Sequence, residues 1–388
     1  MQHSILYVNP ASEISGAEVS LLLLLEGLDR SRFEPTLLVP SEGKLADKAR
    51  AMGISVKVFP IYPFMIEKNL VHSVYDALLS ITKLHKIYQL YKTVQPDLVH
   101  INSYRIGIPF SLVARILNIP SIWHIRDIPT QSAKRKLVGR VSSIADEVIG
   151  ISCAVVDSLE IKHKKNVHVI YNGVDFSQFD TIKPGKFRSE LCLAPDTLLI
   201  VSIGQLIPLK GHDLLIKAFS KVVQQRNIHL VIVGGEIAKI GHGSSNETSY
   251  PLRLKQMVSD LGLLDSVTFT GFRSDIPQIL TDADLYVHAS TSPEGFGRVL
   301  VEAMAAGKAV IAPNWGGSVE IVDPEVNGFL FDPCNLEDLV NRLSYCIQHH
   351  ETLHLVGETG KRSVLPKFSS HLHIANVQKI YHQMTAVE

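Results

Sequence analysis

The chain has few cysteines, and none of them are paired at the spacing of a metal site or a disulfide framework. Cys153, Cys192, Cys334 and Cys346 are the four cysteines among 388 residues, and no C-x-x-C spacing occurs. A structural zinc site or a disulfide-stapled fold needs clustered or regularly spaced cysteines, so we expect neither. The sequence therefore favours a protein of the reducing cytoplasm without a metal site.

An excess of charge of one sign and long apolar runs are also missing. Lys and Arg total 38, as do Asp and Glu, and this zero formal net charge argues against nucleic acid as a partner. The stretch LLLLLEGL falls far short of the roughly 18 apolar residues of a membrane-spanning helix. The first ten residues, MQHSILYVNP, do not have the pattern of a signal peptide. We expect no transmembrane segment.

Short apolar runs alternate with helix-length segments along the chain. In the first half the runs are ILYV (5–8), PTLLVP (35–40), DLVHI (97–101), PSIWHI (120–125), EVIGIS (147–152) and HVIYNG (168–173). After a polar stretch at 179–196 the pattern restarts with TLLIVSIG (197–204), HLVIVGG (229–235), VTFTG (267–271), DLYVHAS (284–290) and AVIAP (309–313). This alternation predicts two doubly wound α/β domains with parallel sheets, which bind ligands at the carboxyl ends of their strands.

One string in the second half combines a strand, a glycine turn and a helix. In SPEGFGRVLVEAMAAGKAVIA, residues 292–312, the turn leads into the amino end of a predicted helix that is closed by Gly307. Helix N–H groups favour an anion such as a pyrophosphate, and Gly295 and Gly297 let the backbone approach it closely. Glu294 precedes the helix and Glu302 lies inside it, so the two carboxylates are expected to serve different groups, such as sugar and ribose hydroxyls.

This string, followed by NWGGSVEIV, resembles the donor-site signature of the family 4 retaining glycosyltransferases, which have the two-domain GT-B fold. The resemblance implies that Glu294 contacts hydroxyls of the transferred sugar and that Glu302 holds the ribose of the nucleotide. It also implies that the backbone at Phe296 and Gly297 lies beside the sugar and the phosphates. The two glycines of NWGGSVEIV would then allow a loop to close over the sugar.

A second element strengthens the resemblance and also departs from it. VSIGQLIPLKGHDLLIKAF, residues 201–219, resembles the family's Gly-Arg-Leu…Lys-Gly element, whose arginine and lysine neutralise the donor diphosphate. Lys210 and Gly211 match, but Gln205 stands where the arginine is usual. Losing one cation would weaken stabilisation of the leaving diphosphate unless Arg298, Lys210 or another basic residue compensates.

The same resemblance covers further segments of both halves. It implies that the base is read near Phe272 and Arg273, largely through the backbone, and a surface or helix-capping role for Arg273 stays open. In the first half, SGAE at 15–18 resembles a glycine loop that faces the donor phosphates and the acceptor, which marks Gly16. YNGVD at 171–175 matches the family's segment at the end of the first domain and is expected to form a tight turn.

The strand IPSIWHIRDIP, residues 119–129, carries the remaining catalytic candidates. In many relatives a histidine follows the proline by about six residues and contacts the sugar, and Arg126 occupies that position here. His124 is the available histidine, and on a strand residues 124 and 126 point to the same side. Either side chain, or both, could face the ligand, and His100 in DLVHINS is a further candidate.

The resemblance implies a GT-B enzyme with residues 1–178 as the acceptor-side domain, 179–366 as the nucleotide-sugar domain and 367–388 as a terminal helix returning to the first domain. Such an enzyme moves a sugar from a nucleotide-diphosphate sugar to a glycan or lipid-linked acceptor, retains the anomeric configuration and needs no metal or other cofactor. Gln205 and the absence of a histidine at 126 leave open a catalytically impaired, nucleotide-sugar-binding partner subunit.

Two other enzyme classes fit the sequence less well. A nucleotide-sugar 2-epimerase of the same fold would lack the E-x7-E string, and an NAD-dependent dehydrogenase would need a G-x-G-x-x-G turn that is missing. The basic clusters SAKRKLVGR (132–140) and IKHKK (161–165) could touch anionic phospholipid or form solvated helix faces. Contact with the inner membrane face therefore stays open beside a cytoplasmic location.

Overall fold

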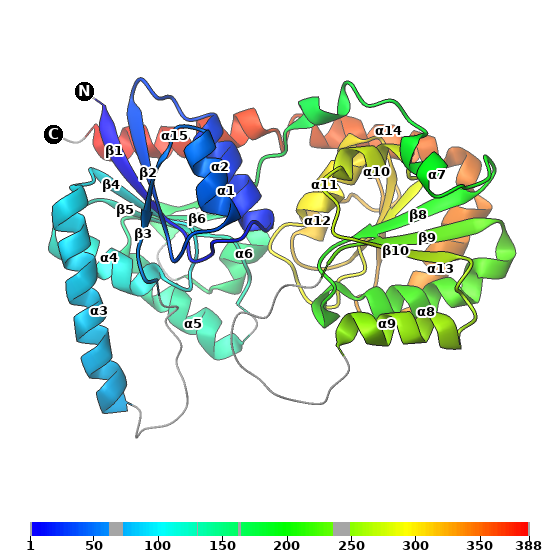
Figure 1. Ribbon diagram of the computed structural model, residues 1–388, viewed down its shortest axis with the longest axis horizontal. Helices are drawn as coiled ribbons and strands as arrows, with labels where there is room; N and C mark the ends of the chain where they lie inside the picture. The colour runs from blue at the N-terminus through cyan, green and yellow to red at the C-terminus, as the bar shows by residue number, and fades with distance from the viewer. Residues whose placement is uncertain (1, 62–72, 130, 162–163, 236–248, 387–388) are drawn as a thin grey trace. The chain divides into compact units, whose positions relative to one another are not determined.

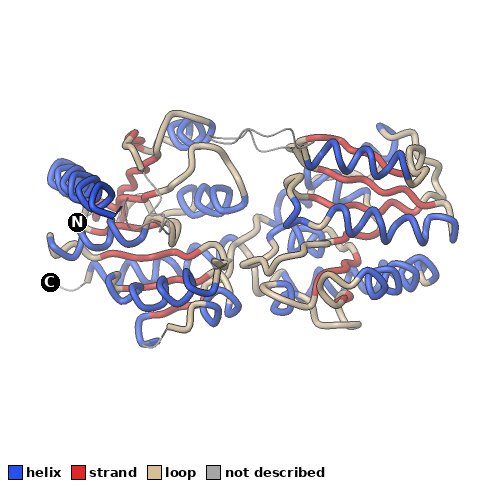
Figure 2. The backbone as a smooth tube through the Cα atoms, turned by 90° about the horizontal axis from the view of Figure 1, so that it is seen from below, coloured by secondary structure: helices blue, strands red, loops and turns tan. Residues whose placement is uncertain are grey.

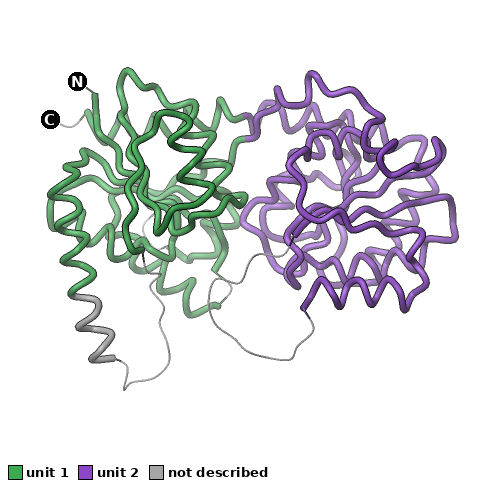
Figure 3. Tube along the Cα trace, viewed as in Figure 1, with its two compact units in different colours: residues 1–173, 370–388 green, residues 174–369 purple. Residues whose placement is uncertain are grey.

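The computed structural model describes residues 2–61, 73–129, 131–161, 164–235 and 249–386. The chain divides into two compact units, unit 1 with Met1–Gly173 and Ser370–Glu388, and unit 2 with Val174–Ser369 (Figure 3). These bounds differ by a few residues from the expected 178/179 and 366/367. Within unit 2 the two connecting segments pair with each other, since Val174 forms a parallel bridge with Ser369 and its N–H donates to the Phe368 carbonyl over 2.8 Å.

Unit 1 contains a seven-stranded sheet in the order β3-β2-β1-β4-β5-β6-β7, with every pair parallel. The strands are β1 (His3–Val8), β2 (Phe33–Val39), β3 (Ser55–Val58), β4 (Leu98–Ile101), β5 (Ser121–Ile125), β6 (Glu147–Gly150) and β7 (Val167–Val169). The helices are α1 (Gly16–Glu26), α2 (Lys44–Ala51), α3 (Ser73–Val94), α4 (Gly107–Ile116), α5 (Ser132–Val141), α6 (Cys153–Ser158) and α15 (Ser370–Thr385). The alternation of strands and helices predicted from the sequence is confirmed.

The alternating side chains of the strands give this sheet two buried faces. Ile5, Leu37 and Ile122 belong to one apolar cluster with leucines of α1 and with Val377 and Tyr381 of α15. On the opposite face Trp123 packs against α4, where its ring would meet any side chain added at Gly107. The terminal helix therefore completes the core of unit 1, as the resemblance implied (Figure 1).

Unit 2 contains a six-stranded parallel sheet in the order β10-β9-β8-β11-β12-β13. Its strands are β8 (Leu198–Ile203), β9 (Ile228–Val233), β10 (Val267–Gly271), β11 (Leu285–Val287), β12 (Ala309–Pro313) and β13 (Phe329–Phe331). Its helices are α7 (Lys186–Glu190), α8 (His212–Val222), α9 (Tyr250–Asp260), α10 (Ile276–Asp282), α11 (Arg298–Ala305), α12 (Ser318–Ile321), α13 (Leu336–Gln348) and α14 (Leu353–Val364). Helices lie on both sides of the strand layer (Figure 2).

Two edge strands were not among the expected elements. The strand β3 has the sequence SVKV, and three of its four residues are exposed, so it lacks the apolar run that marks a buried strand. The strand β13 is buried but only three residues long. Both strands lie at the edge of a sheet, where β3 pairs with β2 and β13 pairs with β12.

No helix in the described part of the chain is long and apolar enough to cross a membrane. The polar segment 240–251, expected to be a loop, lies largely outside the described residues, which resume at Ser249. The expected close of helix α11 is confirmed, since the helix ends at Ala305 and Gly307 has a left-handed φ of 73°.

Candidate functional site

The acidic turn of unit 2 joins the carboxyl end of β11 to the amino end of α11. The helix buries six of its eight residues, so its amino end is held firmly against the sheet. Gly297 precedes the helix with a φ of 88°, a conformation that residues with a side chain rarely adopt. Phe296 directs its ring inward against Phe368, with centroids 5.3 Å apart. The turn therefore leads directly into a helix amino end, with Gly295 partly exposed and Phe296 and Gly297 buried.

The double glycine of NWGGSVEIV packs against this turn. The Gly317 N–H donates to the Glu294 carbonyl over 2.9 Å, and Gly316 has a φ of 57°. A Cβ at Gly316 would lie 2.5 Å from the Glu294 carbonyl oxygen, and one at Gly317 would lie 2.6 Å from the Phe296 Cα. These glycines therefore let the backbone at 316–317 contact the backbone at 294–296. This contact supports the acidic turn.

We expect Gly316→Ala to destabilise the protein by about 2 kcal/mol, because it combines left-handed strain with a backbone clash. Gly262 is the matched control, since it has a φ of 66° but nothing within 4 Å of an added Cβ. Urea unfolding of the two alanine variants measures the difference. Equal destabilisation of both variants would mean that the contact with Glu294 contributes nothing.

Lys210 reaches the acidic turn from a different segment of unit 2. It ends the 3-10 helix Pro208–Lys210, which is anchored because Ser290 Oγ donates to the Leu209 carbonyl over 2.8 Å. The Lys210 ammonium donates to Glu294 Oε1 over 2.7 Å. The two motifs that the sequence singled out, 84 positions apart, thus meet through one charged pair.

His288 joins this pair as a third member. Its Nε2 lies 3.2 Å from Glu294 Oε1, and its Nδ1 lies 3.2 Å from the Tyr286 hydroxyl. Burial alone would raise the pKa of Glu294, but the nearby charges and hydrogen bonds of His288 and Lys210 outweigh burial and hold this pKa well below its usual range. Glu294 is therefore an ionised carboxylate at neutral pH.

Glu302 and Arg298 form the second charged pair of the turn. Arg298 Nε donates to Glu302 Oε1 over 2.8 Å, one helical turn apart on α11. Burial raises the pKa of Glu302, and the Arg298 charge and hydrogen bond oppose that effect. Arg298 was one of the cations expected to compensate for Gln205, and in this structure its charge is matched by Glu302.

The remaining candidates of unit 2 lie at other strand ends. Gln205 is partly exposed after β8, and its carbonyl faces His212 Nε2 at 3.2 Å. Phe272 follows β10, and 78% of its surface is exposed. Arg273 is held by Asp275 and Glu190, with contacts of 2.5 to 2.9 Å, and these partners raise its pKa. The guanidinium of Arg273 therefore has a structural position, whereas Phe272 presents a free aromatic face.

In unit 1 a chain of buried polar side chains runs along the carboxyl ends of the strands. Asn9 follows β1, Asn102 follows β4 and Arg126 follows β5. Asn102 donates to Asn9 over 2.8 Å, and Arg126 Nε donates to Asn102 over 2.8 Å. Asn9 donates in turn to Glu18 over 3.2 Å, and Arg126 Nη1 donates to Asn172 over 2.5 Å. This network places one guanidinium near the amino end of α1.

Arg126 is 4% exposed and remains a cation. Burial lowers its pKa to about 10, an effect that the charge of Glu18 opposes. Among the described residues, Arg126 Nη2 has no hydrogen-bond partner. This nitrogen therefore has N–H groups that can donate to an acceptor.

Gly16 opens α1 beside this network. Its φ is not left-handed, and an added Cβ would meet nothing within 4 Å. Neither backbone conformation nor packing inside unit 1 therefore requires glycine at this position. The Ser15 N–H donates to Glu18 Oε2 over 3.0 Å, which stabilises the amino end of the helix.

His124, which the sequence left open beside Arg126 as a residue that could face the ligand, lies in the core of unit 1. His124 is fully buried inside β5 on the face covered by α15, and its ring lies 5.9 Å from that of His373. Its Nδ1 pairs with His100 Nε2 at 3.1 Å, and His100 Nδ1 pairs with the Tyr381 hydroxyl at 2.7 Å. Burial holds the pKa of both His100 and His124 well below the usual range, so both are neutral core residues.

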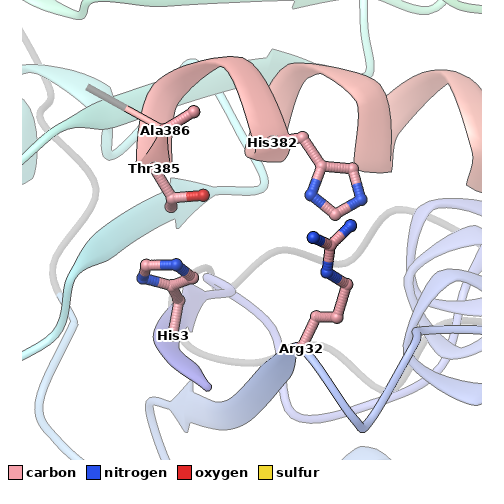
Figure 4. Close-up of a pocket in the computed structure, with 5 residues that line it drawn as sticks. All are labelled: His3, Arg32, His382, Thr385 and Ala386. Atoms are coloured by element: carbon pink, nitrogen blue, oxygen red, sulfur yellow. The ribbon is translucent and has the colours of Figure 1, made fainter. Parts of the chain in front are cut away.

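Two cavities lie away from these residues. One, of about 270 Å³, is at the start of β1 and is lined by His3, Arg32, His382, Thr385 and Ala386 (Figure 4). The other, of about 240 Å³, lies at the amino end of β8 and includes Arg188 and Lys308. Parallel sheets bind ligands at the opposite, carboxyl ends of their strands, where the candidate residues are found.

Sequence reasoning missed His288, Asn9 and Asn102. A signal for the asparagines exists, since each directly follows a buried strand, where a parallel sheet presents side chains to ligands. His288 also directly follows a strand, but its partner Glu294 becomes apparent only when the turn is folded.

Two family models match the chain. "Glycosyl transferases group 1" matches residues 186–363, and "Glycosyltransferase Family 4" matches residues 14–178. Among curated proteins, the chain is 25% identical over 402 residues to an Escherichia coli UDP-Gal:alpha-D-GlcNAc-diphosphoundecaprenol alpha-1,3-galactosyltransferase, covering 96% of this chain and 98% of that protein. It is 30% identical to a Salmonella typhimurium lipopolysaccharide 1,2-N-acetylglucosaminetransferase, over 52% of this chain and 53% of the relative.

Solved structures agree with the fold. Anabaena HepE, crystallised with UDP and glucose, superposes with a TM-score of 0.80 at 25% identity, over 98% of this chain and all of HepE. A Rickettsia africae glycosyltransferase superposes with a TM-score of 0.83 at 23% identity, over the full length of both chains.

Proposed function

Because the chain belongs to glycosyltransferase family 4 and is an enzyme that uses a nucleotide sugar, we propose that it transfers a hexose-type sugar from a UDP-sugar to a glycan or lipid-linked acceptor, with retention of anomeric configuration. We infer that the nucleotide of the donor carries uracil, because HepE was crystallised with UDP and the E. coli relative is named for UDP-Gal. Nuclear magnetic resonance of the anomeric proton in the product tests retention.

The observation that carries this proposal is the pairing of Lys210 with Glu294 at the start of α11. We assign Glu294 to the sugar hydroxyls and Glu302 to the ribose, since ionised carboxylates accept hydrogen bonds from such groups. The exposed ring of Phe272 offers the base a stacking surface. Backbone from Gly295 to Gly297 and the amino end of α11 would receive the diphosphate.

The reaction breaks the bond between the anomeric carbon and the β-phosphate oxygen and forms a bond from that carbon to an acceptor hydroxyl oxygen, whose proton passes to the departing diphosphate or to solvent. Negative charge grows on the departing diphosphate, so positive groups already in place lower the barrier. Lys210 and the helix amino end supply that charge, and we therefore propose that no metal ion is needed. UDP release that persists in excess EDTA would support this, and its loss would refute it.

Unit 1 is proposed to contact the acceptor or the donor phosphates through Arg126 and Gly16. Arg126 brings a fixed cation with an unpartnered donor nitrogen, and Gly16 leaves room for close approach. The diphosphoundecaprenol acceptor in the name of the E. coli relative is anionic, which suits such a cation.

A lipid-linked acceptor would bring the enzyme to the cytoplasmic membrane face. Lys134, Arg135, Lys136 and Arg140 of α5 could then contact anionic lipid. Sedimentation with vesicles containing phosphatidylglycerol tests this proposal, and no binding at low salt would reject it.

Gln205 supports one alternative, a nucleotide-sugar-binding partner subunit with impaired chemistry. Such a protein would bind the donor as an enzyme does but would release no diphosphate in a single turnover. Measuring UDP formation with enzyme in excess of donor separates the two functions.

We expect one uridine diphosphate sugar to raise the melting temperature in a panel of uridine, guanosine and adenosine diphosphate sugars, because a ligand bound to the native state stabilises it by mass action. Glu302→Gln should remove most of that shift, since it lacks the charge proposed for the ribose. Glu337→Gln, at an exposed surface position of α13, is the matched control. A folded protein that responds to no donor would contradict the proposed function.

A further inference from the structure

His288 is a buried imidazole placed directly behind the proposed sugar-binding carboxylate. Its side chain is 7% exposed, and it lies between the buried Tyr286 hydroxyl and Glu294. The family signature drew attention to the acids, the glycines and the lysine but not to this residue. His288 directly follows β11 and so belongs to the turn between β11 and α11.

The two ring nitrogens of His288 face different partners. Nε2 lies 3.2 Å from Glu294 Oε1, close but not aligned as a full hydrogen bond, and since a carboxylate can only accept, the proton in this contact belongs to Nε2. Nδ1 lies 3.2 Å from the Tyr286 hydroxyl, which can donate to a neutral ring or accept from a protonated one, so this contact exists in both forms. Tyr286 thereby holds the imidazole plane in the orientation that points Nε2 at Glu294.

Lys210 and His288 make their contacts with the same carboxylate oxygen, Oε1 of Glu294. The other oxygen, Oε2, takes neither contact. If the Lys210 ammonium turns toward a diphosphate, His288 is the donor that still holds the carboxylate. Its ring is fixed by burial and by Tyr286, whereas the lysine side chain is long and flexible.

From this geometry, and resting on the proposed function of Glu294, we propose that His288 is a positioning residue for sugar recognition. It keeps the Glu294 carboxylate oriented toward the donor sugar while Lys210 is engaged by the diphosphate. The consequence is selective: His288 should matter for the sugar part of the donor and not for the nucleotide part.

The test compares binding of UDP with binding of UDP-glucose and UDP-galactose by calorimetry, using the full chain. We expect wild type to bind one UDP-sugar more tightly than UDP. In His288→Asn, whose amide is too short to reach Glu294, affinity for that UDP-sugar should fall about tenfold or more, as for a lost hydrogen bond to a charged group. Affinity for UDP should stay within about twofold.

His288→Gln provides the rescue, because its terminal amide can place an N–H near the position of Nε2. It should recover most of the sugar-dependent gain that His288→Asn loses. His229→Asn is the control, since His229 is a half-buried histidine of the same sheet that pairs with Thr268 on β10. This control should change neither affinity.

Four outcomes would overturn the proposal, and they distinguish its failure from that of the proposed function. If His288→Asn keeps the sugar-dependent gain, His288 does not position Glu294. If it loses UDP and UDP-sugar affinity equally, or if glutamine rescues nothing, the residue has only a structural role. If wild type gains nothing from either sugar while Glu294→Gln behaves identically, the proposed role of Glu294 falls first and this inference falls with it.

Discussion

Glu294→Gln is expected to lower kcat/KM for sugar transfer by about 100-fold or more. The amide has nearly the same shape as the carboxylate, so it can still offer its carbonyl oxygen to Lys210 and His288. Its NH2 group then replaces the acceptor oxygen proposed for the sugar hydroxyls, and the negative charge is lost. A hydroxyl that donated to the carboxylate loses its charged acceptor, a contact worth about 1.5 to 3 kcal/mol before any transition-state contribution is added.

The same substitution has an expected effect on stability. The pKa of Glu294 is held below its usual range in the folded protein, so the ionised carboxylate stabilises the fold at neutral pH. This contribution is complete above the ordinary carboxyl pKa of about 4.3, and it is lost as pH falls toward the lower folded value. Glu294→Gln should therefore be less stable than wild type at pH 7, and the difference should shrink in acid.

Initial rates of UDP release, with a lipid-diphosphate-linked N-acetylhexosamine as acceptor, measure the catalytic effect. Urea unfolding at pH 7 and at steps down to about pH 3 measures the effect on stability, since the contribution is lost below the ordinary carboxyl pKa of about 4.3. Glu337→Gln, exposed on α13, should change neither. A rate within threefold of wild type would remove Glu294 from the proposed donor site.

Lys210→Met is expected to lower kcat by about 100- to 1000-fold, because it removes the only cation that the resemblance retains at the diphosphate position. Gln205 cannot replace this charge, and Arg298 is paired with Glu302. The flexible, neutral methionine side chain keeps most of the volume of the lysine stem, so the substitution tests charge rather than packing.

Stability separates the two roles of Lys210. The Lys210 and Glu294 side chains are 26% and 23% exposed, so breaking the pair should cost about 1 to 2 kcal/mol, less than for a fully buried pair. The double variant Lys210→Met/Glu294→Gln removes both charges and should recover part of this stability without recovering activity. Lys221→Met, which breaks the exposed pair with Glu337, is the control.

A double variant with near wild-type turnover would contradict both assignments at once. If Lys210→Met alone retains turnover, the positive charge at the leaving group must come from elsewhere, and Arg126 becomes the next residue to test. Single-turnover UDP release is the suitable measurement, because it reports the chemical step without product release.

The fold was predictable because its dominant signals are local. Buried parallel strands such as LLIVSI of β8 are continuous apolar runs, and the helices between them have lengths that suit crossover connections. The edge strand β3 escaped this reasoning, since its exposed SVKV sequence forms a strand only because β2 offers it a hydrogen-bonding edge. The sequence could not reveal that neighbour.

The donor-side candidates were predictable for a similar reason. Glu294, Gly297 and Glu302 lie within nine residues, so one strand-turn-helix motif specifies them together. The acceptor-side candidates were less certain, because residues 124 and 126 share a direction only while both belong to a regular strand. The strand ends at Ile125. Arg126 therefore lies beyond the carboxyl end of the strand, where it bonds Asn102, whereas His124 lies in the core.

By itself, then, the sequence determined the α/β class, the two-domain organisation, the acidic turn and the lysine that accompanies it. Only the tertiary structure decided that Lys210 and His288 share one oxygen of Glu294, that Gly316 supports the turn, and that His124 is packed under α15. The physical reason is the distance along the chain over which each kind of interaction acts. Propensity, periodicity and turn chemistry act between near neighbours in the chain, whereas hydrogen-bond partners and burial depend on side chains that packing brings together from distant positions.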